Sequence, residues 1–385
     1  MASYRCAVIG GGGGRGRGWA ARIHRWPKGD AHQLQLVAIA DISEISLNKA
    51  VEKFGCKGYK DYIEMMDKEK PDIVVVATPH YVHAPMAIAA AERGINVFCE
   101  KPMCINLKQA DEMRAAVEKS RIKLAVGFQH RFDPIYVALK NAVRSGDMGD
   151  IFQINAIYHW WRKEDYYLNS TPVPENMDLD WPGWKGHWLT EGGGALANQI
   201  MHHMDLFQWI APSPVKSVIA LSKVAKHTFI ETDDNTNVIV EFQNGSMGII
   251  QAGVAYQHDR DDVFGVYGTE GAIVHRKNNK GLFGIPRFFE DYRKKAIKKK
   301  KRMWSYVPSL KINLNKAVMD NFINAVANDD AKSISVDVNE GRKSIELLRA
   351  ILLSQVEGKK ITFPFDDKPA DYPALQHTYQ DKDLV

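Results

Sequence analysis

The chain of 385 residues has few cysteines, little net charge and no long apolar run. Its four cysteines, Cys6, Cys56, Cys99 and Cys104, show no CxxC spacing, so we expect buried or partly buried free thiols in a reducing compartment. No apolar run approaches the roughly 20 residues that span a bilayer. The first residues, MASYRCAVIG, lack a signal-peptide segment and lead directly into a strand. We therefore predict a cytoplasmic protein with no membrane partner.

The charge balance gives little support to nucleic-acid binding. Lys and Arg total 51 against 46 Asp and Glu, and 45% of residues are hydrophobic, as in ordinary globular proteins. One run, RKKAIKKKKR at 293–302, is strongly basic. Such a run can bind nucleic acid or an anionic membrane. It lacks the interleaved aromatic residues of single-strand binders, so we favour a solvated insertion and expect no nucleic-acid partner.

The N-terminal region predicts a dinucleotide site. A buried strand leads into a glycine-rich stretch in which Gly11, Gly13 and Gly16 have the G-x-G-x-x-G spacing. These glycines permit a sharp turn, close approach of the backbone to a pyrophosphate, and packing of the helix on the strand. Free N–H groups at the helix start then bind phosphates, and Arg15 and Arg17 add positive charge. A flexible loop is the alternative.

A second apolar run, LQLVAIAD, ends in Asp41, 25 residues after Gly16. A carboxylate at about this distance binds the ribose diol of NAD and repels the 2′-phosphate of NADP. We therefore predict NAD as the cofactor, with NADP less favoured. A helix N-cap is the alternative role for Asp41.

Strand and helix patterns alternate through the first third of the chain, which predicts a doubly wound parallel sheet. Ligands bind such sheets at the carboxyl ends of the strands. Three predicted strand ends carry notable residues: Thr78-Pro79, Glu100-Lys101-Pro102 and Gln129-His130-Arg131.

After residue 130 the pattern changes to alternating runs typical of strands with one buried face. NVIVEFQNGSMGIIQAG forms two such runs around Asn-Gly, a strong hairpin signal. The predicted fold class is α/β, with an N-terminal Rossmann dinucleotide-binding domain at 1–130. We expect an α+β domain with a mostly antiparallel open sheet at 131–385, for substrate binding and oligomerisation.

The dinucleotide fingerprint, together with ATPHYVHAPMAIAAAERGINVFCEKP and GFQHRFDP, resembles the Gfo/Idh/MocA oxidoreductases. That family includes glucose–fructose oxidoreductase and inositol dehydrogenase. The resemblance covers most of the chain and includes a later GGG-x-L…H-x-x-D pattern. It implies that Lys101 is the active-site lysine, close to the nicotinamide and the substrate hydroxyl. A buried ammonium beside a cofactor has the chemistry to polarise an oxygen or relay a proton, with a surface salt bridge as the alternative.

The resemblance also implies that Glu100 contacts the cofactor and that His83 matches the histidine after the Thr-Pro motif. The residues expected to bind NAD are Gly11, Gly13, Arg15, Gly16, Arg17, Asp41, Thr78, Pro79, His83, Glu100, Lys101 and Gln129.

The stretch 192–205, GGGALANQIMHHMD, predicts a helix that begins close to the substrate. Asn198 and His202 are four apart and are expected to share a face, whereas His203 lies about 100° round the helix. In the family pattern His202 falls on the catalytic histidine, and Asn198 falls where many members have aspartate. We predict His202 as general base in oxidation and acid in reduction, and Asn198 as a group that orients the hydroxyl. Asp205 is expected to support the helix.

Two other interpretations of this stretch remain. His202 is a satisfied core histidine in one, and in the other a metal is held by His202, His203, Asp205 and His187. Adjacent histidines on a helix point apart, and no HExxH or paired Cys/His spacing is present. We therefore predict no metal.

A loop at 162–190, with the strand before it, is rich in aromatic and basic residues. Its PGWKGHW segment resembles a W-R/K-G-x-W segment in one branch of the family. Aromatic faces stack on sugar rings, and basic groups bind hydroxyls or acids, although core packing is the alternative for any single tryptophan. The residues expected to bind substrate are His130, Arg131, Tyr158, Trp161, Arg162, Trp184, Lys185, Trp188, Asn198 and His202.

The resulting hypothesis is an NAD-dependent sugar or glycoside dehydrogenase that oxidises a secondary ring hydroxyl, such as C3 of a glucoside. The alternatives are an inositol or anhydrosugar dehydrogenase, and an NAD-dependent glycosidase that oxidises C3 transiently. A dinucleotide-binding sensor or corepressor is the non-enzyme alternative. The resemblance further implies a homo-oligomer assembled through the C-terminal sheet.

Overall fold

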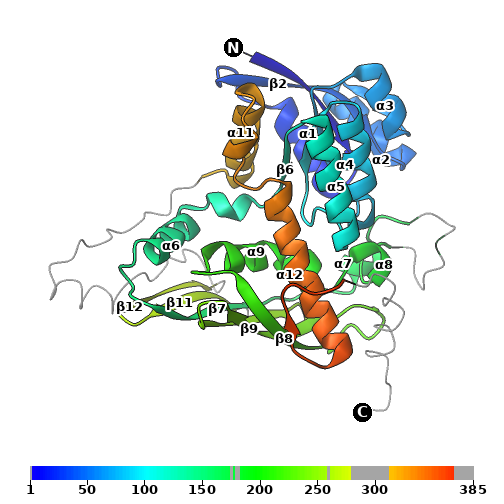
Figure 1. The fold of residues 1–385 in the computed structure, drawn as a ribbon. Helices are drawn as coiled ribbons and strands as arrows, with labels where there is room; N and C mark the ends of the chain where they lie inside the picture. Colours follow the sequence, from blue (N-terminus) through cyan, green and yellow to red (C-terminus); the bar gives the residue numbers. More distant parts are fainter. Residues whose placement is uncertain (1, 174–176, 178–182, 258–260, 279–311, 368–385) are drawn as a thin grey trace. The chain divides into compact units, whose positions relative to one another are not determined.

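The computed structural model describes residues 2–173, 177, 183–257, 261–278 and 312–367. The chain splits into two compact units, shown as a ribbon in Figure 1. Unit 1 comprises Met1–Phe128 and Asn315–Ile345, and unit 2 comprises Gln129–Leu314 and Glu346–Val385. From the sequence we expected one boundary at residue 130, but the structure returns 315–345 to the first unit. The basic run at 293–302 lies outside the described residues.

Unit 1 contains a six-stranded, all-parallel sheet in the order β3-β2-β1-β4-β5-β6. Its strands are β1 (Ala2–Ile9), β2 (His32–Ala40), β3 (Lys57–Tyr59), β4 (Ile73–Val76), β5 (Asn96–Cys99) and β6 (Leu124–Val126). Every residue of β4 is buried, as expected for a central parallel strand covered on both faces. The predicted doubly wound fold is confirmed.

The strand expected to end at Gln129-His130-Arg131 is shorter than predicted. β6 ends at Val126, the Phe128 N–H turns back to the Val126 carbonyl at 2.7 Å, and Gln129–Phe132 form a 3₁₀ helix, η2. The turn directs these residues away from the strand line.

Three helices of unit 1 begin at side-chain caps. Ser43, Asp61 and Asn106 each accept a hydrogen bond from a backbone N–H of the first turn that follows. The helical segments are α1 (Gly14–His24), α2 (Glu44–Phe54), α3 (Tyr62–Glu69), η1 (His80–Val82), α4 (His83–Glu92), α5 (Leu107–Ser120), α11 (Leu314–Ala327) and η4 (Ala331–Ser333).

The returning segment completes the core of unit 1. The Val126 N–H donates to the Val336 carbonyl at 2.9 Å, which extends the hydrogen bonding beyond β6. Phe322 on α11 meets Phe98 on β5 edge to face, with ring centroids 5.9 Å apart.

Unit 2 contains a seven-stranded sheet in the order β12-β11-β7-β10-β9-β8-β13. Only the β7–β10 pair is parallel among these strands, so the expected mostly antiparallel sheet is confirmed. The predicted Asn-Gly hairpin is the β9–β10 pair. The strands are β7 (Ile151–His159), β8 (Val215–Lys223), β9 (Asn235–Phe242), β10 (Met247–Gly253), β11 (Asp261–Gly268), β12 (Gly271–Asn278) and β13 (Ile361–Thr362).

The other elements of unit 2 are helical. They are η2, α6 (Pro134–Arg144), α7 (Asp165–Leu168), α8 (Trp188–Glu191), η3 (Leu196–Ile200) and α9 (Met201–Ile210), and α12 (Val338–Glu357) ends here. Figure 1 shows α6 and α9 over one face of the sheet, so inward side chains such as Ala156 on β7 are buried against them.

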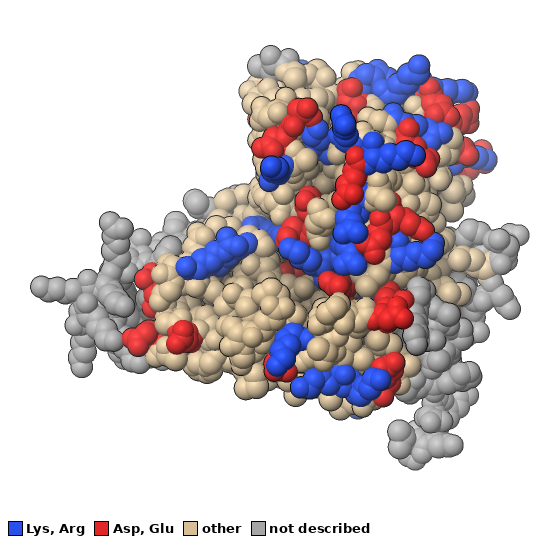
Figure 2. Space-filling model, in the orientation of Figure 1, with Lys and Arg blue, Asp and Glu red and all other residues tan. Residues whose placement is uncertain are grey.

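The surface gives two further facts. On the face shown in Figure 2, Lys and Arg side chains are interspersed with Asp and Glu, without a large area of one sign. Among the described helices, none has the length and apolar character to span a membrane.

Candidate functional site

The glycine-rich turn of unit 1 has the shape that a dinucleotide requires. A Cβ added at Gly16 would lie 2.0 Å from the Gly10 carbonyl oxygen, so only glycine allows this approach of α1 to the turn. A Cβ at Gly11 would lie 2.7 Å from Ile39 Cγ2. At Gly13 an added Cβ meets no heavy atom of the described residues within 4 Å. The turn is thus closely packed on one side and has room for a pyrophosphate at the start of α1.

Asp41 lies at the carboxyl end of β2 and faces the glycine turn. Its Oδ2 accepts a hydrogen bond from the Gly12 N–H at 2.9 Å, and its Oδ1 accepts one from the Ser43 N–H at 2.9 Å. Ser43, and not Asp41, is the N-cap of α2, so the capping alternative is wrong. The carboxylate is held where a ribose diol of NAD is expected.

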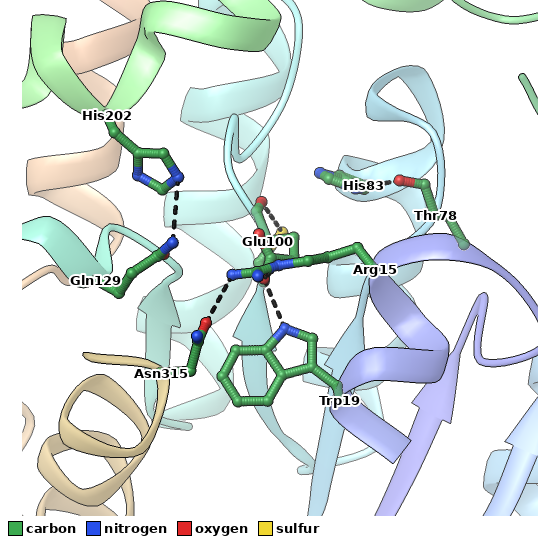
Figure 3. Close-up of polar contacts among 9 residues, drawn as sticks. Arg15, Trp19, Thr78, His83, Glu100, Gln129, His202 and Asn315 are labelled. Carbon is green, nitrogen blue, oxygen red and sulfur yellow. Dashed lines mark hydrogen bonds and ion pairs between the residues drawn. The ribbon is translucent and has the colours of Figure 1, made fainter. Parts of the chain in front are cut away.

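Glu100 binds two side chains of α1, Arg15 and Trp19 (Figure 3). Its Oε1 accepts hydrogen bonds from Arg15 Nε and Trp19 Nε1, both at 2.6 Å, and the residue is 4% exposed. Arg15 also donates to Asn315 Oδ1 at 2.9 Å. Glu100 therefore fixes the first turn of α1 against the end of β5. Its direct contact with the cofactor stays a prediction, as do those of Arg15 and the exposed Arg17.

His83 links two strand ends. Its ring nitrogens lie 2.7 Å from the Pro102 carbonyl oxygen and 2.8 Å from that of Thr78. The ring is 1% exposed, and burial lowers its pKa. His83 thus links the backbone after β4 to the backbone next to Lys101. Lys101 follows the end of β5 by two residues and is half-buried. Thr78 and Pro79 at the end of β4 are also half-buried.

In unit 2 the GGG helix differs from the expected single α-helix. Leu196–Ile200 form a π-helical turn before α9. Because π turns bond i to i+5, the rule that residues four apart share a face does not apply across this junction. The Asn198 side chain contacts Glu191, whereas the His202 ring contacts Gln129. Asn198 and His202 have different hydrogen-bond partners, so these contacts do not support the prediction that the two side chains share a face.

The two adjacent histidines have different environments. His202 is half-buried, its Nε2 lies 3.4 Å from Gln129 Nε2, and its ring stacks on His130 with centroids 4.7 Å apart. Figure 3 shows the His202–Gln129 contact. His203 is 5% exposed and stacks on Tyr158 at 3.7 Å. Of the two, His202 is the less buried.

Four predicted substrate ligands are buried, and Asn198 is the least buried of them at 8% exposed. Arg131 is 5% exposed and donates from Nε and Nη2 to the Asp205 carboxylate at 2.8 and 2.6 Å. Tyr158 and Trp188 are 1% and 0% exposed. Arg131 with Asp205 anchors α9 to η2, and substrate contact by these buried residues stays a prediction. The sequence shows side-chain chemistry but not burial, which is why they were included.

The other predicted substrate residues are half-buried. His130 lies in η2, and the loop after β7 carries Trp161, Arg162, Trp184 and Lys185. Arg162 Nε donates to Gln199 Oε1 at 2.7 Å. Lys185 lies 3.6 Å from the centroid of the Tyr166 ring, and burial lowers the pKa of its ammonium to about 8. Trp161, with His227 and Gln257, lines a cavity of about 370 Å³.

Glu191 is a residue that sequence reasoning missed. It is 2% exposed, its Oε1 accepts from Asn198 Nδ2 at 2.5 Å, and burial raises its pKa to about 7. The available signal was its position, an acid directly before three glycines and a polar helix.

Within the described ranges, no three His, Cys, Asp or Glu side chains are arranged to hold a metal ion. His187, one of the ligands considered, is buried with its Nδ1 2.7 Å from Glu231 Oε1.

Comparisons with known families match both parts of the chain. Residues 4–128 match the model described as an oxidoreductase family with an NAD-binding Rossmann fold, and residues 136–274 match the GFO/IDH/MocA C-terminal domain. Myo-inositol 2-dehydrogenase of Thermotoga maritima is 26% identical over 339 residues, 84% of this chain and 92% of that protein. Levoglucosan dehydrogenase of Pseudarthrobacter phenanthrenivorans is 27% identical over 260 residues, 61% of this chain and 63% of that protein.

Solved structures share the fold. The WlbA dehydrogenase from Bordetella pertussis, in complex with NADH and UDP-GlcNAcA, has a TM-score of 0.78 at 24% identity, covering 95% of this chain and 99% of that one. A levoglucosan dehydrogenase in complex with NADH and levoglucosan has a TM-score of 0.73 at 21% identity, covering 94% of this chain and 100% of that one.

Proposed function

This chain belongs to the GFO/IDH/MocA family of NAD-dependent oxidoreductases, and we propose that it oxidises a secondary ring hydroxyl of a sugar or glycoside. The observation that supports this most is the pair of unlike histidines on α9. His203 is buried against Tyr158, whereas His202 is half-buried with its Nε2 beside the Gln129 amide. Of the two histidines on the segment that carries Asn198, His202 is therefore the candidate for proton transfer.

Oxidation of an alcohol removes a proton from oxygen and a hydride from carbon. We assign the proton to His202, since an imidazole titrates near neutral pH and serves in both directions. Lys101 polarises the oxygen and relays the proton, and Asn198 orients the hydroxyl. NAD, when bound, supplies a nicotinamide C4 that accepts the hydride. The fit of Gly11, Gly13, Gly16 and Asp41 to that cofactor supports the assignment.

For the substrate we propose a glycoside oxidised at C3 to a 3-keto sugar, with inositol or an anhydrosugar as the alternative. Half-buried Trp161 and Trp184 offer apolar faces for ring C–H groups, and Arg162 and Lys185 supply hydrogen-bond donors. The relatives named for myo-inositol and levoglucosan also act on cyclic polyols.

The test is NADH formation with methyl glucoside, a nitrophenyl glucoside, myo-inositol and levoglucosan. We expect NADH with at least one of them, and identification of the keto product locates the carbon. Nitrophenol without net NADH would instead support a glycosidase that oxidises C3 transiently. If no sugar yields NADH or nitrophenol while NAD still binds, the proposed function is rejected.

We also propose that the open face of the unit 2 sheet binds a second copy of the chain. Four apolar side chains on β8, β9 and β10 are exposed there: Ile219 (41%), Leu221 (76%), Ile239 (56%) and Met247 (54%). An exposed apolar patch of this kind marks an interaction surface. A second copy carries the same apolar patch, so a two-fold pairing would cover both patches at once. We expect an oligomer by light scattering and a monomer after Leu221→Lys; a wild-type monomer contradicts the proposal.

A further inference from the structure

Glu191 is a buried acid to which the proposed reaction gives no role. It ends α8 and directly precedes the three glycines. Its Oε2 accepts hydrogen bonds from the Gly186 N–H at 3.0 Å and the Thr232 hydroxyl at 3.3 Å. Its Oε1 accepts one from Asn198 Nδ2 at 2.5 Å. All three partners present donors, which is the arrangement that an ionised carboxylate requires.

The Asn198 amide is held by Glu191 and Gln199, and its side chain also hydrogen-bonds the Tyr166 side chain. Its nitrogen donates to Glu191, and its Oδ1 accepts from Gln199 Nε2 at 3.3 Å. Gln199 is itself fixed, because its Oε1 accepts from Arg162 Nε at 2.7 Å. The two ends of an amide are alike in shape but opposite in hydrogen bonding. An ionised carboxylate only accepts, so it selects the orientation with the nitrogen inward.

We propose that Glu191 is a positioning residue whose ionised carboxylate holds the Asn198 nitrogen inward and leaves the Asn198 oxygen to accept a hydrogen bond from the sugar hydroxyl. The proposal rests on the proposed function only for the identity of that hydroxyl. A protonated Glu191 carboxyl can donate as well as accept, so it no longer selects one orientation of the Asn198 amide, and the alcohol binds more weakly.

The groups around Glu191 place its protonation near neutral pH. Burial raises the pKa of Glu191 to about 7, although the hydrogen bonds from Asn198 and Gly186 oppose the rise. Lys185, in the loop before α8, favours the ionised form, and Asp233, before β9, disfavours it. Burial and the Glu191 charge both raise the pKa of Tyr166 and Tyr167 on α7. The carboxyl is therefore protonated below about pH 7 and ionised above it.

The first experiment needs no substrate. In protein with ¹⁵N-labelled asparagine, the Asn198 side-chain NH₂ signals, assigned by their loss in Asn198→Ser, are followed by NMR across neutral pH. We expect a shift with a midpoint near 7 in the wild type and none in Glu191→Gln, which is neutral throughout. Asp233→Asn is the matched control, because it removes another buried acid with a raised pKa, about 6, and should keep the shift. A shift that persists in Glu191→Gln, or is absent in the wild type, overturns the proposal.

A second experiment connects this orientation to binding. We expect the KM for methyl glucoside to rise roughly tenfold as pH falls through 7 in the wild type, the size of one lost hydrogen bond. In Glu191→Gln the KM should be high and independent of pH. If Glu191→Gln fails to fold, Glu191→Asp keeps a titratable carboxyl that is one methylene shorter, and the midpoint of the NMR shift should move; a wild-type midpoint overturns the proposal. A wild type that shows the NMR shift but oxidises no sugar rejects the proposed function and not the positioning role.

Discussion

The two units hold their polar groups in different ways. In unit 1 the candidate cofactor residues stand at strand ends and a glycine turn, so the backbone itself sets their positions, as with Asp41 bonded to the Gly12 N–H. In unit 2 the candidate substrate residues lie on a π turn, a short helix and a loop, and side chains position other side chains. Arg162 holds Gln199, and Glu191 holds Asn198. Backbone motifs have local sequence patterns, whereas networks of buried side chains join residues that are far apart in the sequence. The difference predicts which substitutions affect cofactor binding and which affect substrate chemistry.

The largest effect should come from His202→Ala. Loss of a general acid–base group lowers kcat by about 10²–10⁴-fold. NAD affinity, measured by fluorescence titration, should change little because all the predicted cofactor residues except Gln129 belong to unit 1. His202→Ala with wild-type kcat, or with lost NAD binding, would break the separation of roles between the units.

Arg131→Met should be the most destabilising substitution of those considered. It leaves the buried Asp205 carboxylate without its bidentate partner, and breaking such a pair costs about 3–5 kcal/mol. Thermal unfolding of Arg131→Met and of Arg131→Met with Asp205→Leu measures this. The double variant should recover much of the loss, since no buried charge then lacks a partner. A single variant as stable as the wild type contradicts a structural role for Arg131.

Asp41→Ala should have a smaller effect that is confined to the cofactor. Hydrogen bonds to a charged group are worth about 1.5–3 kcal/mol, so NAD affinity should fall by roughly 10–100-fold. NADP binding should weaken less or improve, because the carboxylate that repels its phosphate is gone. Dissociation constants for both cofactors give the answer. An unchanged NAD preference would remove Asp41 from the site.

Glu44→Ala should have no measurable effect on unfolding. Glu44 pairs with Lys60 at 2.7 Å, but both side chains are well exposed, and exposed ion pairs contribute little. This variant is the surface counterpart of Arg131→Met, and thermal unfolding of the two side by side sharpens the contrast between exposed and buried pairs. A clear destabilisation would show that unit 1 also relies on side-chain pairs.

The sequence predicted most of unit 1 because its signals are local. Glycine spacing, apolar strands and an acid at a strand end predicted the parallel sheet and the Asp41 position, and the structure agrees. In unit 2 it predicted the hairpin and the different fates of His202 and His203, but it assigned Arg131 to the substrate. Arg131 pairs with Asp205, 74 positions away, and no local pattern reveals such a partner.

The π turn at Leu196–Ile200 and the role of Glu191 were missed for the same reason. The spacing of Asn198 and His202 fits an ordinary helix, and only the contacts with Glu191 and Gln129 show where the two side chains go. Trp188 and Tyr158 have the chemistry of sugar ligands, but tertiary packing buries them.

The return of residues 315–345 to unit 1 has a consequence for biosynthesis. The N-terminal unit is the first to leave the ribosome and among the last to be finished, because Phe322 and Val336 are made only after most of unit 2. Until then Phe98 has Trp19 beside it but lacks Phe322, and Arg15 lacks Asn315. A nascent chain that stops before residue 315 would expose apolar surface on the nucleotide-binding sheet, where chaperones bind, and would acquire its finished cofactor turn only after translation is nearly complete.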